Sequence, residues 1–295
     1  MSFDSTYDLE YLIKYPDLVL SIFSLVTNAI HLFFLSRNFS NFIFLFFIAG
    51  ADLLNAIVTM IHEIMAVLQY IDFKNCIGYI NYIDLAFKVF LASLEMLSTN
   101  LGPWITVVWT LIGYRNPTMY ATWTFILCSL YSISFMIYYV IRILHLPYVE
   151  CNSSNLSNVY LEQNHNWVTI LANVVWWCEV VHKVSLYLFY LVFLIRLPCK
   201  IWIRKTAKMF KLNFFILLSF ISSEMLSLMV CQMILPEEER QGNRLVSQVA
   251  LHLPTELIRL IGNVACCLRP FLVLWKCEEY QDTVKRFFRI DNNVA

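Results

Sequence analysis

The sequence has little glycine, little proline and little charge. Of its 295 residues, 6 are glycine, 8 are proline and 14% are charged. The scarcity of glycine and proline excludes collagen-like and low-complexity chains and favours long regular elements. Soluble domains carry about 25% charged residues, so an ordinary soluble enzyme is excluded as well. The net charge is zero. The chain therefore lacks the basic surface that binds nucleic acid, and we expect no nucleic-acid partner.

Hydrophobic residues are abundant and lie in long runs. They make up 59% of the chain, and the mean hydropathy is +0.63. A helix needs roughly 20 apolar residues to cross about 30 Å of hydrocarbon. Seven stretches meet this length, at residues 17–36, 42–69, 79–112, 119–146, 167–195, 212–235 and 246–275. The sequence thus predicts an all-α membrane protein with a seven-transmembrane helix bundle. A short amphipathic helix follows at residues 278–289, where it would lie along the membrane interface.

Lysine and arginine are distributed unevenly between the two sets of loops. With the N-terminus outside, the inner loops and tail carry twelve of them and the outer ones four. Cytoplasmic loops carry the excess of basic residues in membrane proteins. This predicts a multi-pass protein of the plasma membrane, with an extracellular N-terminus at residues 1–16, a bundle at 17–275 and a cytoplasmic helix and tail at 276–295. Glycosylation sequons at Asn152 and Asn155 fall on the outside, whereas the one at Asn38 falls inside.

Two of the nine cysteines fall on the oxidising side of the membrane. These are Cys76 and Cys151, and a disulfide between them would tie the long outer loop to the top of the third span. The alternative is two free outer thiols. Cys277 follows the last span among basic residues, and the sequence leaves open whether it is palmitoylated.

Short motifs recur in order along the seven spans. They are Asn28 in the first, Ala51-Asp52-Leu53-Leu54 in the second, Trp104 and then Arg115-Asn116-Pro117 at the end of the third, and Cys267-Leu268-Arg269-Pro270-Phe271-Leu272 in the last. Together they resemble the rhodopsin-like seven-helix G-protein-coupled receptors. Within these, the chain is most similar to the nematode serpentine chemoreceptors of class W, which are similar to FMRFamide-type peptide receptors. The resemblance implies a receptor rather than an enzyme, without a cofactor. Its partners would be membrane lipid, an extracellular small-molecule or peptide ligand and a heterotrimeric G protein.

The resemblance assigns polar roles inside the bundle. Asn28 and Asp52 match an asparagine and an aspartate of the superfamily, in which the aspartate lies in a hydrated pocket that can hold sodium. Asn263 is a further polar candidate on the last span.

The chain departs from the family pattern at three positions. Thr110 stands where class W receptors carry an arginine. In the last span Arg269 and Val273 replace the asparagine and the tyrosine of an NPxxY-like motif, whereas Pro270 is retained. These replacements leave open a degenerate receptor that does not couple to a G protein.

Several charges lie inside the predicted spans. A charge at the bilayer centre costs about 2.5–3.5 kcal/mol on insertion scales, so each one is expected to have a partner. In the superfamily the positions of Asp52 and Arg269 face each other, which predicts a buried ion pair. The alternative places the Arg269 head group at the inner interface. Glu256 and Arg259 are three residues apart and would pair along one helix face.

The outer halves of spans three, five and seven supply a candidate ligand site. Ligands of the superfamily enter there, and mixed charges beside aromatic rings suit a peptide or a small polar signal. The candidate residues are Tyr82, Asp84, Lys88, Trp176, Trp177, Glu179, His182, Lys183, Glu256 and Arg259. For the tryptophans the alternative is an aromatic belt at the membrane interface. Glu179 and His182 match half of a di-metal motif, but no second half follows, so we expect no metal.

Two other classes of membrane protein remain as alternatives. A transporter or channel subunit predicts a repeat, and the sequence has none. An intramembrane enzyme requires a nucleophile with its base or a metal constellation, and no such set is present.

Overall fold

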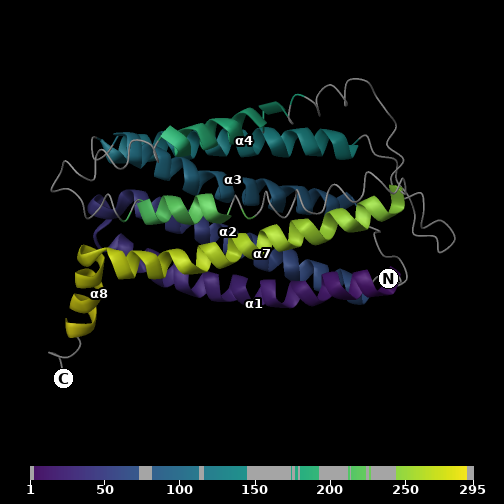
Figure 1. Cartoon of the computed structure of the whole chain (residues 1–295), viewed down its shortest axis with the longest axis horizontal. Helices are drawn as coiled ribbons and strands as arrows, with labels where there is room; N and C mark the ends of the chain where they lie inside the picture. The colour runs from purple at the N-terminus through teal and green to yellow at the C-terminus, as the bar shows by residue number, and fades with distance from the viewer. Residues whose placement is uncertain are drawn as a thin grey trace.

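The computed structural model is a bundle of long helices (Figure 1). It describes residues 3–72, 82–112, 116–144, 174, 177–178, 180–192, 212, 214–223, 226 and 244–290. Its labelled helices are α1 (Phe3–Ser36), α2 (Phe39–Asp72), α3 (Tyr82–Ile112), α4 (Pro117–Leu144), α7 (Arg244–Lys276) and α8 (Glu278–Ile290). Two shorter apolar helices lie at Val180–Val192 and Phe214–Ser223. This described part contains no strand, which confirms the all-helical prediction.

The long helices pack side by side in an order that follows the chain. α1 packs against α2 and α7, α2 packs against α3, and α3 packs against α4. Figure 1 shows the N-terminus at one end of the bundle and α8 at the other. Residues of α1, α2, α3 and α7 therefore meet in the interior, and this is where the polar side chains discussed below lie.

Within the described residues, three helical stretches are long and apolar enough to cross a membrane. They are Lys14–Ser36, Phe39–Met65 and Pro117–Tyr138, and the bent pair α7 and α8 gives a fourth if it counts as one span. The multi-pass membrane character is thereby supported, and the complete set of seven spans stays a prediction. α1 begins at Phe3, well before the expected start of the first span at residue 17. Pro16 lies inside this helix without ending it.

The first helix is polar inside and apolar outside. Its buried stripe contains Asp17, Ser21, Ser24, Asn28 and His31, all at most 4% exposed. Successive members are three or four residues apart, so they share one helix face. The opposite face exposes large apolar side chains such as Val19 and Ile30. A helix of a soluble protein has its apolar side chains inside and its polar side chains outside, so this distribution is the reverse and suits a lipid environment.

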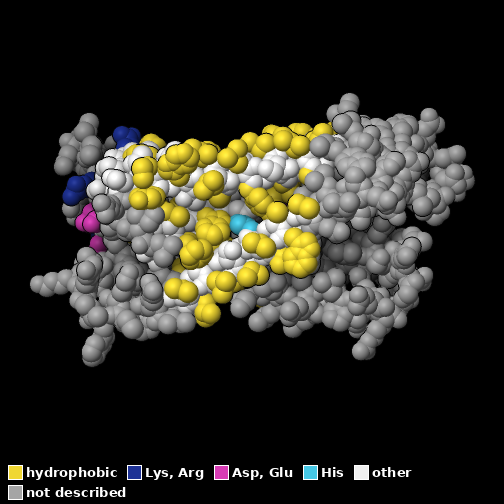
Figure 2. Space-filling model, turned by 90° about the horizontal axis from the view of Figure 1, so that it is seen from above, with side chains coloured by type: hydrophobic (Ala, Val, Ile, Leu, Met, Phe, Trp, Pro, Cys, Tyr) yellow, Lys and Arg dark blue, Asp and Glu magenta, His cyan; other side chains and the backbone are white. Residues whose placement is uncertain are grey.

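Apolar side chains also cover the exposed face of α4. Trp123, Leu127 and Leu130 are each more than half exposed. Figure 2 shows hydrophobic side chains along the described surface, with charged side chains gathered at one end. A surface of this kind is unsuited to water and fits the hydrocarbon of a bilayer.

The chain turns by 89° between α7 and α8. The Gln281 side chain donates hydrogen bonds to the carbonyls of Leu274 (2.7 Å) and Trp275 (3.2 Å), which caps the last turn of α7. Tyr280 forms a 2.7 Å hydrogen bond with Nδ1 of His31 on α1. Burial raises the pKa of the Tyr280 hydroxyl, which therefore keeps its proton. The predicted amphipathic C-terminal helix is present, and these contacts hold it against α1.

Candidate functional site in the helix interior

A buried ion pair joins α2 to α7. Nη1 of Arg269 contacts the Oδ1 atom of Asp52, and the two residues are 6% and 4% exposed. Arg269 also donates through Nη1 to Sγ of Cys266, at 3.6 Å. The pair that the sequence predicts is therefore present. The alternative position for Arg269, at the membrane interface, is wrong, because the guanidinium finds its counter-charge inside the bundle.

The same guanidinium contacts the helix Phe214–Ser223. Its Nε donates a hydrogen bond to the Ser219 hydroxyl at 3.3 Å. Its central carbon lies 3.7 Å from the centre of the Phe220 ring. Gly102 of α3 lies at the tip of this ring, where an added Cβ would lie 2.6 Å from Cζ of Phe220. One arginine thus touches two other helices, and its neighbour Phe220 reaches a third.

A chain of hydrogen bonds runs through the interior next to this ion pair. Asn263 on α7 donates to Oδ1 of Asp17 on α1, at 2.6 Å. Asn55 on α2 donates to the Asn263 side-chain oxygen at 3.1 Å and lies 3.7 Å from Sγ of Cys266. The Ser98 hydroxyl of α3 lies 3.2 Å from the Asn55 oxygen. Four helices are therefore joined by polar side chains that are all at most 7% exposed.

The two asparagines that the resemblance singled out occupy different places. Asn28 donates to the Ser24 carbonyl at 3.0 Å and to the Cys266 carbonyl on α7 at 3.3 Å, which joins α1 to α7. Asn263 belongs to the hydrogen-bond chain and is fully buried. Both are interior residues, as expected. Their hydrogen bonds run to α1, α2 and α7, whereas Asp52 accepts a hydrogen bond from Arg269.

A second group of charges lies nearer the N-terminal end of the bundle. Arg259 on α7 is 3.4 Å from Glu63 on α2 and 3.3 Å from Glu95 on α3. Lys14 on α1 is 3.9 Å from Glu63. We call Lys14, Glu63, Glu95 and Arg259 the charged cluster. It contains two cations and two carboxylates, so its net charge is zero, and it joins four helices.

Arg259 has partners on two other helices that spacing along the chain does not reveal. These described contacts run to α2 and α3. The pair of Glu256 and Arg259 stays a prediction, because the Glu256 side chain lies outside the described residues. Glu95, for which the sequence offered no local partner, acquires one through this packing. A buried arginine head group can reach neighbouring helices, and local spacing does not reveal such pairs.

His182 lies among aromatic rings at a helix junction. The indole N–H of Trp104 on α3 donates to Nε2 of His182, on the helix Val180–Val192. The ring of Tyr131 on α4 lies 5.2 Å from that of His182. His182 thus joins three helices, which is a structural role. Trp177, in contrast, is 59% exposed, in keeping with the aromatic belt alternative.

Many of the predicted site residues cannot be placed. The side chains of Tyr82, Asp84, Trp176, Glu179 and Glu256 lie outside the described residues, as do Cys76, Cys151, Asn152 and Asn155. Of the ligand-site residues, the structure describes the side chains of Lys88, Trp177, His182, Lys183 and Arg259. His182 and Arg259 belong to separate contact groups. The ligand site therefore remains a prediction.

The sequence missed several interior residues. Asp17, Glu63 and Ser98 each contact another helix through a polar group. Trp104, which belongs to the motif of the third span, donates to His182. A signal existed for Asp17, because polar residues recur every three or four positions through the first span. No group of three or more potential metal ligands occurs in the described part of the chain.

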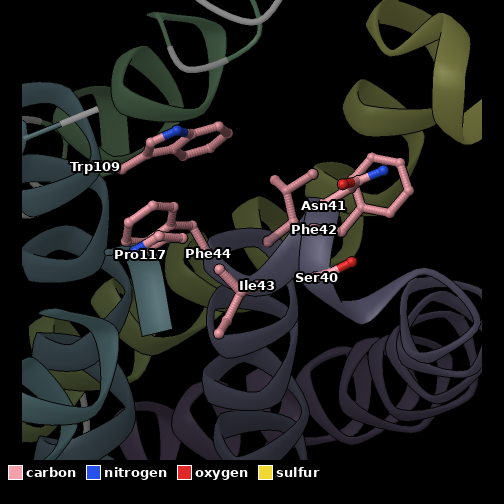
Figure 3. Close-up of a pocket in the computed structure, with 8 residues that line it drawn as sticks. Ser40, Asn41, Phe42, Ile43, Phe44, Trp109 and Pro117 are labelled. Carbon is pink, nitrogen blue, oxygen red and sulfur yellow. The ribbon is translucent and has the colours of Figure 1, made fainter. Parts of the chain in front are cut away.

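A small hollow opens near the α8 end of the bundle, between α2, α3 and α4. It has room for about one water molecule, and Ser40, Asn41, Phe44, Trp109 and Pro117 are among its lining residues. Figure 3 shows Trp109 on one side of the hollow, above Phe44, and Ser40 and Asn41 on the other. The Trp109 and Phe44 rings are stacked, 5.5 Å apart. Ligand pockets are of several hundred Å³, so this hollow is too small to be one.

The positions that depart from the family pattern are inside the bundle or facing it. The Thr110 hydroxyl donates to the Thr106 carbonyl at 2.7 Å, within α3. Val273 is 2% exposed and Pro270 is buried in α7. Cys277 is 4% exposed and packs in the core, so its thiol is not open to acylation in this conformation.

A family model supports the resemblance over part of the chain. Residues 15–115 match the model described as "Serpentine type 7TM GPCR chemoreceptor Srw". This is about a third of the 295 residues and covers α1 from Tyr15 onwards, α2 and α3. The similarity to class W serpentine receptors is confirmed there. No curated protein matches the chain.

Proposed function

We propose that this protein is a chemosensory or neuropeptide-type receptor that passes the binding of an extracellular ligand to a cytoplasmic G protein. It would span the plasma membrane seven times, with residues 1–16 outside and residues 276–295 inside. Sugars on Asn152 and Asn155 and a disulfide between Cys76 and Cys151 belong to the same proposal. The protein would act by rearranging its helices and would need no cofactor.

The observation that carries the proposal is the family match to the first three helices. The interior polar contacts support it. In a bilayer helices have little hydrophobic reason to associate, so packing and hydrogen bonds between helices determine their arrangement. Here Asp17, Asn55 and Asn263 connect three helices, and Arg269 connects α7 to α2 and to Phe214–Ser223. A receptor needs such contacts, because they allow a change at one end to alter packing at the other.

The charged cluster suggests how a ligand would act. Glu95 and Arg259 have side chains 28% and 15% exposed, whereas Glu63 is fully buried. Lys88 lies seven residues before Glu95 on α3, two helical turns away on the same face. A polar ligand that enters from outside would meet Lys88 first and then the charged cluster. Ser98, one turn deeper on α3, is hydrogen-bonded to Asn55. Movement of α3 at Glu95 would therefore alter the hydrogen-bond chain.

A non-coupling receptor is the second candidate. The observations that favour it are Thr110 in place of the family arginine and Val273 in place of the tyrosine. Threonine carries no charge, so the inner end of α3 has no cation at position 110. The Thr110 hydroxyl donates to a carbonyl of its own helix. Such a receptor would bind ligand and rearrange without engaging a G protein.

A ligand-screened signalling assay tests the proposal. Cells expressing the full chain are exposed to panels of peptides and small molecules. Resonance energy transfer between Gα and Gβγ measures their dissociation. We expect a ligand-dependent response from the native chain. A response only from Thr110→Arg would identify the non-coupling receptor. Thr118→Arg is the matched control, because it adds the same charge to an exposed position at the start of α4. Silence in all three with ligand-independent solute flux would contradict the receptor and support a transporter.

A further inference from the structure

Arg259 contacts two carboxylates that differ in their access to water. Its Nη1 atom lies 3.4 Å from Oε1 of Glu63, whose side chain is fully buried. Its Nε atom lies 3.3 Å from Oε1 of Glu95, whose side chain is 28% exposed. Release of Glu63 would deprive a buried carboxylate of its closer cation, whereas water or a ligand can solvate a released Glu95. The contact between Arg259 and Glu95 is therefore the one that a polar ligand can open.

The interior face of α7 borders open space one turn beyond Arg259. Gly262 lies three residues after Arg259 and four before Cys266, so the three share a helix face. Cys266 is buried, which shows that this face points into the bundle. A Cβ built at Gly262 would meet no atom of a neighbouring helix within 4 Å. Because protein interiors are otherwise closely packed, this position has room for a small group beside the charged cluster.

A buried hydroxyl group without a partner lies at the same level on α2. Thr59 is four residues from Asn55 and four from Glu63, so the three share one helix face. Asn55 and Glu63 both contact α7, and the stretch of α7 between these two contacts contains Gly262. Thr59 is 1% exposed, and its Oγ1 atom has no hydrogen-bond partner among the described residues. Burial of such a hydroxyl is costly, so a ligand that accepts its hydrogen would gain from it.

The charge balance of the charged cluster selects the kind of ligand. Its two cations and two carboxylates sum to zero. A ligand with only a carboxylate would take Arg259 from Glu95 and leave the glutamate without this cation. A ligand with only an ammonium group would take Glu95 and leave Arg259 with one carboxylate fewer. A ligand with both groups satisfies both side chains, because one ion pair is replaced by two and the net charge stays at zero.

We propose that the charged cluster binds a small zwitterion, an α-amino acid, by opening the contact between Glu95 and Arg259. The ligand carboxylate binds Arg259 and accepts a hydrogen bond from the Thr59 hydroxyl. The ligand ammonium group binds Glu95, and its side chain occupies the open space at Gly262.

This site identifies the chemical class of the ligand. In an α-amino acid the two charged groups are attached to one carbon atom, so they can reach Glu95 and Arg259 together. In a peptide the same two groups stand at opposite ends of the chain, which favours the amino acid over the peptide. For its consequence in the cell, a change in signalling, the inference rests on the proposed receptor function. Binding itself does not.

Direct binding to the full chain in lipid nanodiscs tests the site without a G protein. The probes are tritiated L-alanine, L-leucine and L-phenylalanine in a scintillation proximity assay, with the N-acetyl and the amide derivative of each as competitors. Acetylation removes the ammonium charge, and amidation removes the carboxylate. We expect at least one of the amino acids to bind and its two derivatives to bind about tenfold more weakly, because each lacks one charged contact.

Glu95→Gln separates a ligand contact from a structural role. It removes the partner of the ligand ammonium group and also the carboxylate that competes for Arg259. The amino acid should therefore bind about tenfold more weakly, whereas its N-acetyl derivative should bind more tightly than to the native chain. Glu279→Gln is the matched control, since it removes a carboxylate from an exposed position on α8. Its binding should equal that of the native chain.

Thr59→Val replaces the hydroxyl with a methyl group of the same shape. Binding should weaken about tenfold, because the ligand carboxylate loses a donor. The unfolding temperature should not fall, since the hydroxyl has no partner to lose. A merely structural role of Thr59 would predict the opposite combination of results.

Gly262→Leu fills the open space and should abolish binding of the amino acid. Leucine is a better helix former than glycine, so the substitution should not unfold α7. Val264→Leu is the matched control, because it enlarges a side chain two residues away that is 40% exposed. Its binding should be unchanged.

The site would be overturned if none of the three amino acids bound the native chain, or if a derivative bound more tightly than its parent. Unchanged binding in both Thr59→Val and Gly262→Leu would also contradict it. The same amino acids are then added to cells in the signalling assay. Binding without signalling would leave the site standing and refute its coupling to a G protein. Signalling by a peptide in the absence of any amino-acid binding would support the receptor and refute the site.

Discussion

The guanidinium of Arg269 on α7 forms an ion pair with the carboxylate of Asp52 on α2, and both groups are buried. At the matching aspartate the superfamily has a hydrated pocket that can hold a sodium ion. In this chain an arginine side chain supplies the positive charge instead. The counter-charge of Asp52 is thus covalently part of α7, and it cannot leave the pocket as an ion could.

Single substitutions at this ion pair should be strongly destabilising. Removing one partner leaves the other charge buried, which costs about 3–5 kcal/mol. We therefore expect Asp52→Ala and Arg269→Ala each to lower the unfolding temperature in detergent markedly. The double variant Asp52→Asn/Arg269→Gln removes both charges and should be more stable than either. Additive losses in a thermal-shift measurement would show that the two side chains do not interact.

Substitutions in the charged cluster should lower the stability of the protein by different amounts. Arg259 contacts Glu63, which is fully buried, and Glu95, which is 28% exposed in its side chain. Arg259→Gln should cost about 3–5 kcal/mol because Glu63 then loses a close cation. Glu95→Gln should cost less than half as much, since water can reach that carboxylate. Lys14→Gln should cost least, because Lys14 lies 3.9 Å from Glu63 and Arg259 remains. The order of unfolding temperatures checks this, and a larger loss from Lys14→Gln than from Arg259→Gln would contradict it.

The ion pair was predictable from the sequence, whereas the hydrogen-bond chain was not. Asp52 and Arg269 stand at positions of known proximity in the superfamily, so a charge at each implies a contact. The sequence indicates that Asn263 is polar and interior, but it assigns no role to its partner Asp17, which stands at the start of the first span. Which face of α1 turns towards α7 depends on the packing of both helices. A hydropathy pattern gives only the stretch that is buried in the membrane.

The close contact between Phe220 and Gly102 shows a second limit of sequence reasoning. Gly102 lies in an ordinary apolar stretch, and nothing next to it in the sequence indicates that an aromatic ring needs the space. Phe220 is one of 23 phenylalanines. The fit between them exists only where two helices approach closely. The charge of Arg269, in contrast, stood out against its apolar surroundings, because a charge in a membrane span needs a partner.

The contact between α1 and α8 predicts different results for two substitutions at one residue. Tyr280 bonds to His31, and its ring packs against Phe34 and Phe42. Tyr280→Phe removes the hydroxyl and should cost about 1 kcal/mol. Tyr280→Ala also removes a buried ring and should cost about 3–5 kcal/mol. Proteolysis between α7 and α8 should accelerate in the same order. Equal rates in the two variants would show that the hydrogen bond, and not the ring packing, holds α8.

The distribution of sequons provides a test of orientation. If the N-terminus is outside, Asn152 and Asn155 face the lumen of the endoplasmic reticulum and receive glycans, whereas Asn38 does not. Treatment with an amidase that removes N-glycans should lower the apparent mass of the native chain in gel electrophoresis. Asn152→Gln/Asn155→Gln should abolish the shift and Asn38→Gln should leave it unchanged. A shift that depends on Asn38 would reverse the orientation and contradict the excess of basic residues on the inner side.

The hydrogen-bond chain predicts that Asn263 matters more than its neighbour Ser98. Asn263→Leu would remove the hydrogen bond that the buried Asp17 carboxylate accepts from Asn263 and the one that the Asn55 amide donates to it. An unsatisfied buried group costs about 1–3 kcal/mol, and more if it is charged. Ser98→Ala removes one hydroxyl from the end of the chain, and such bonds between membrane helices average about 0.6 kcal/mol. We therefore expect a large fall in unfolding temperature for Asn263→Leu and a small one for Ser98→Ala.

Thr99→Ala serves as the control for this pair of substitutions. Its hydroxyl is exposed and lies 2.9 Å from a carbonyl of its own helix, so its loss should change the unfolding temperature little. Asp17→Asn in the Asn263→Leu background should recover part of the stability, because it removes the charge that has lost its hydrogen bond. If Asn263→Leu were as stable as Thr99→Ala, the hydrogen bond between Asn263 and Asp17 would contribute nothing to the packing of α1 against α7.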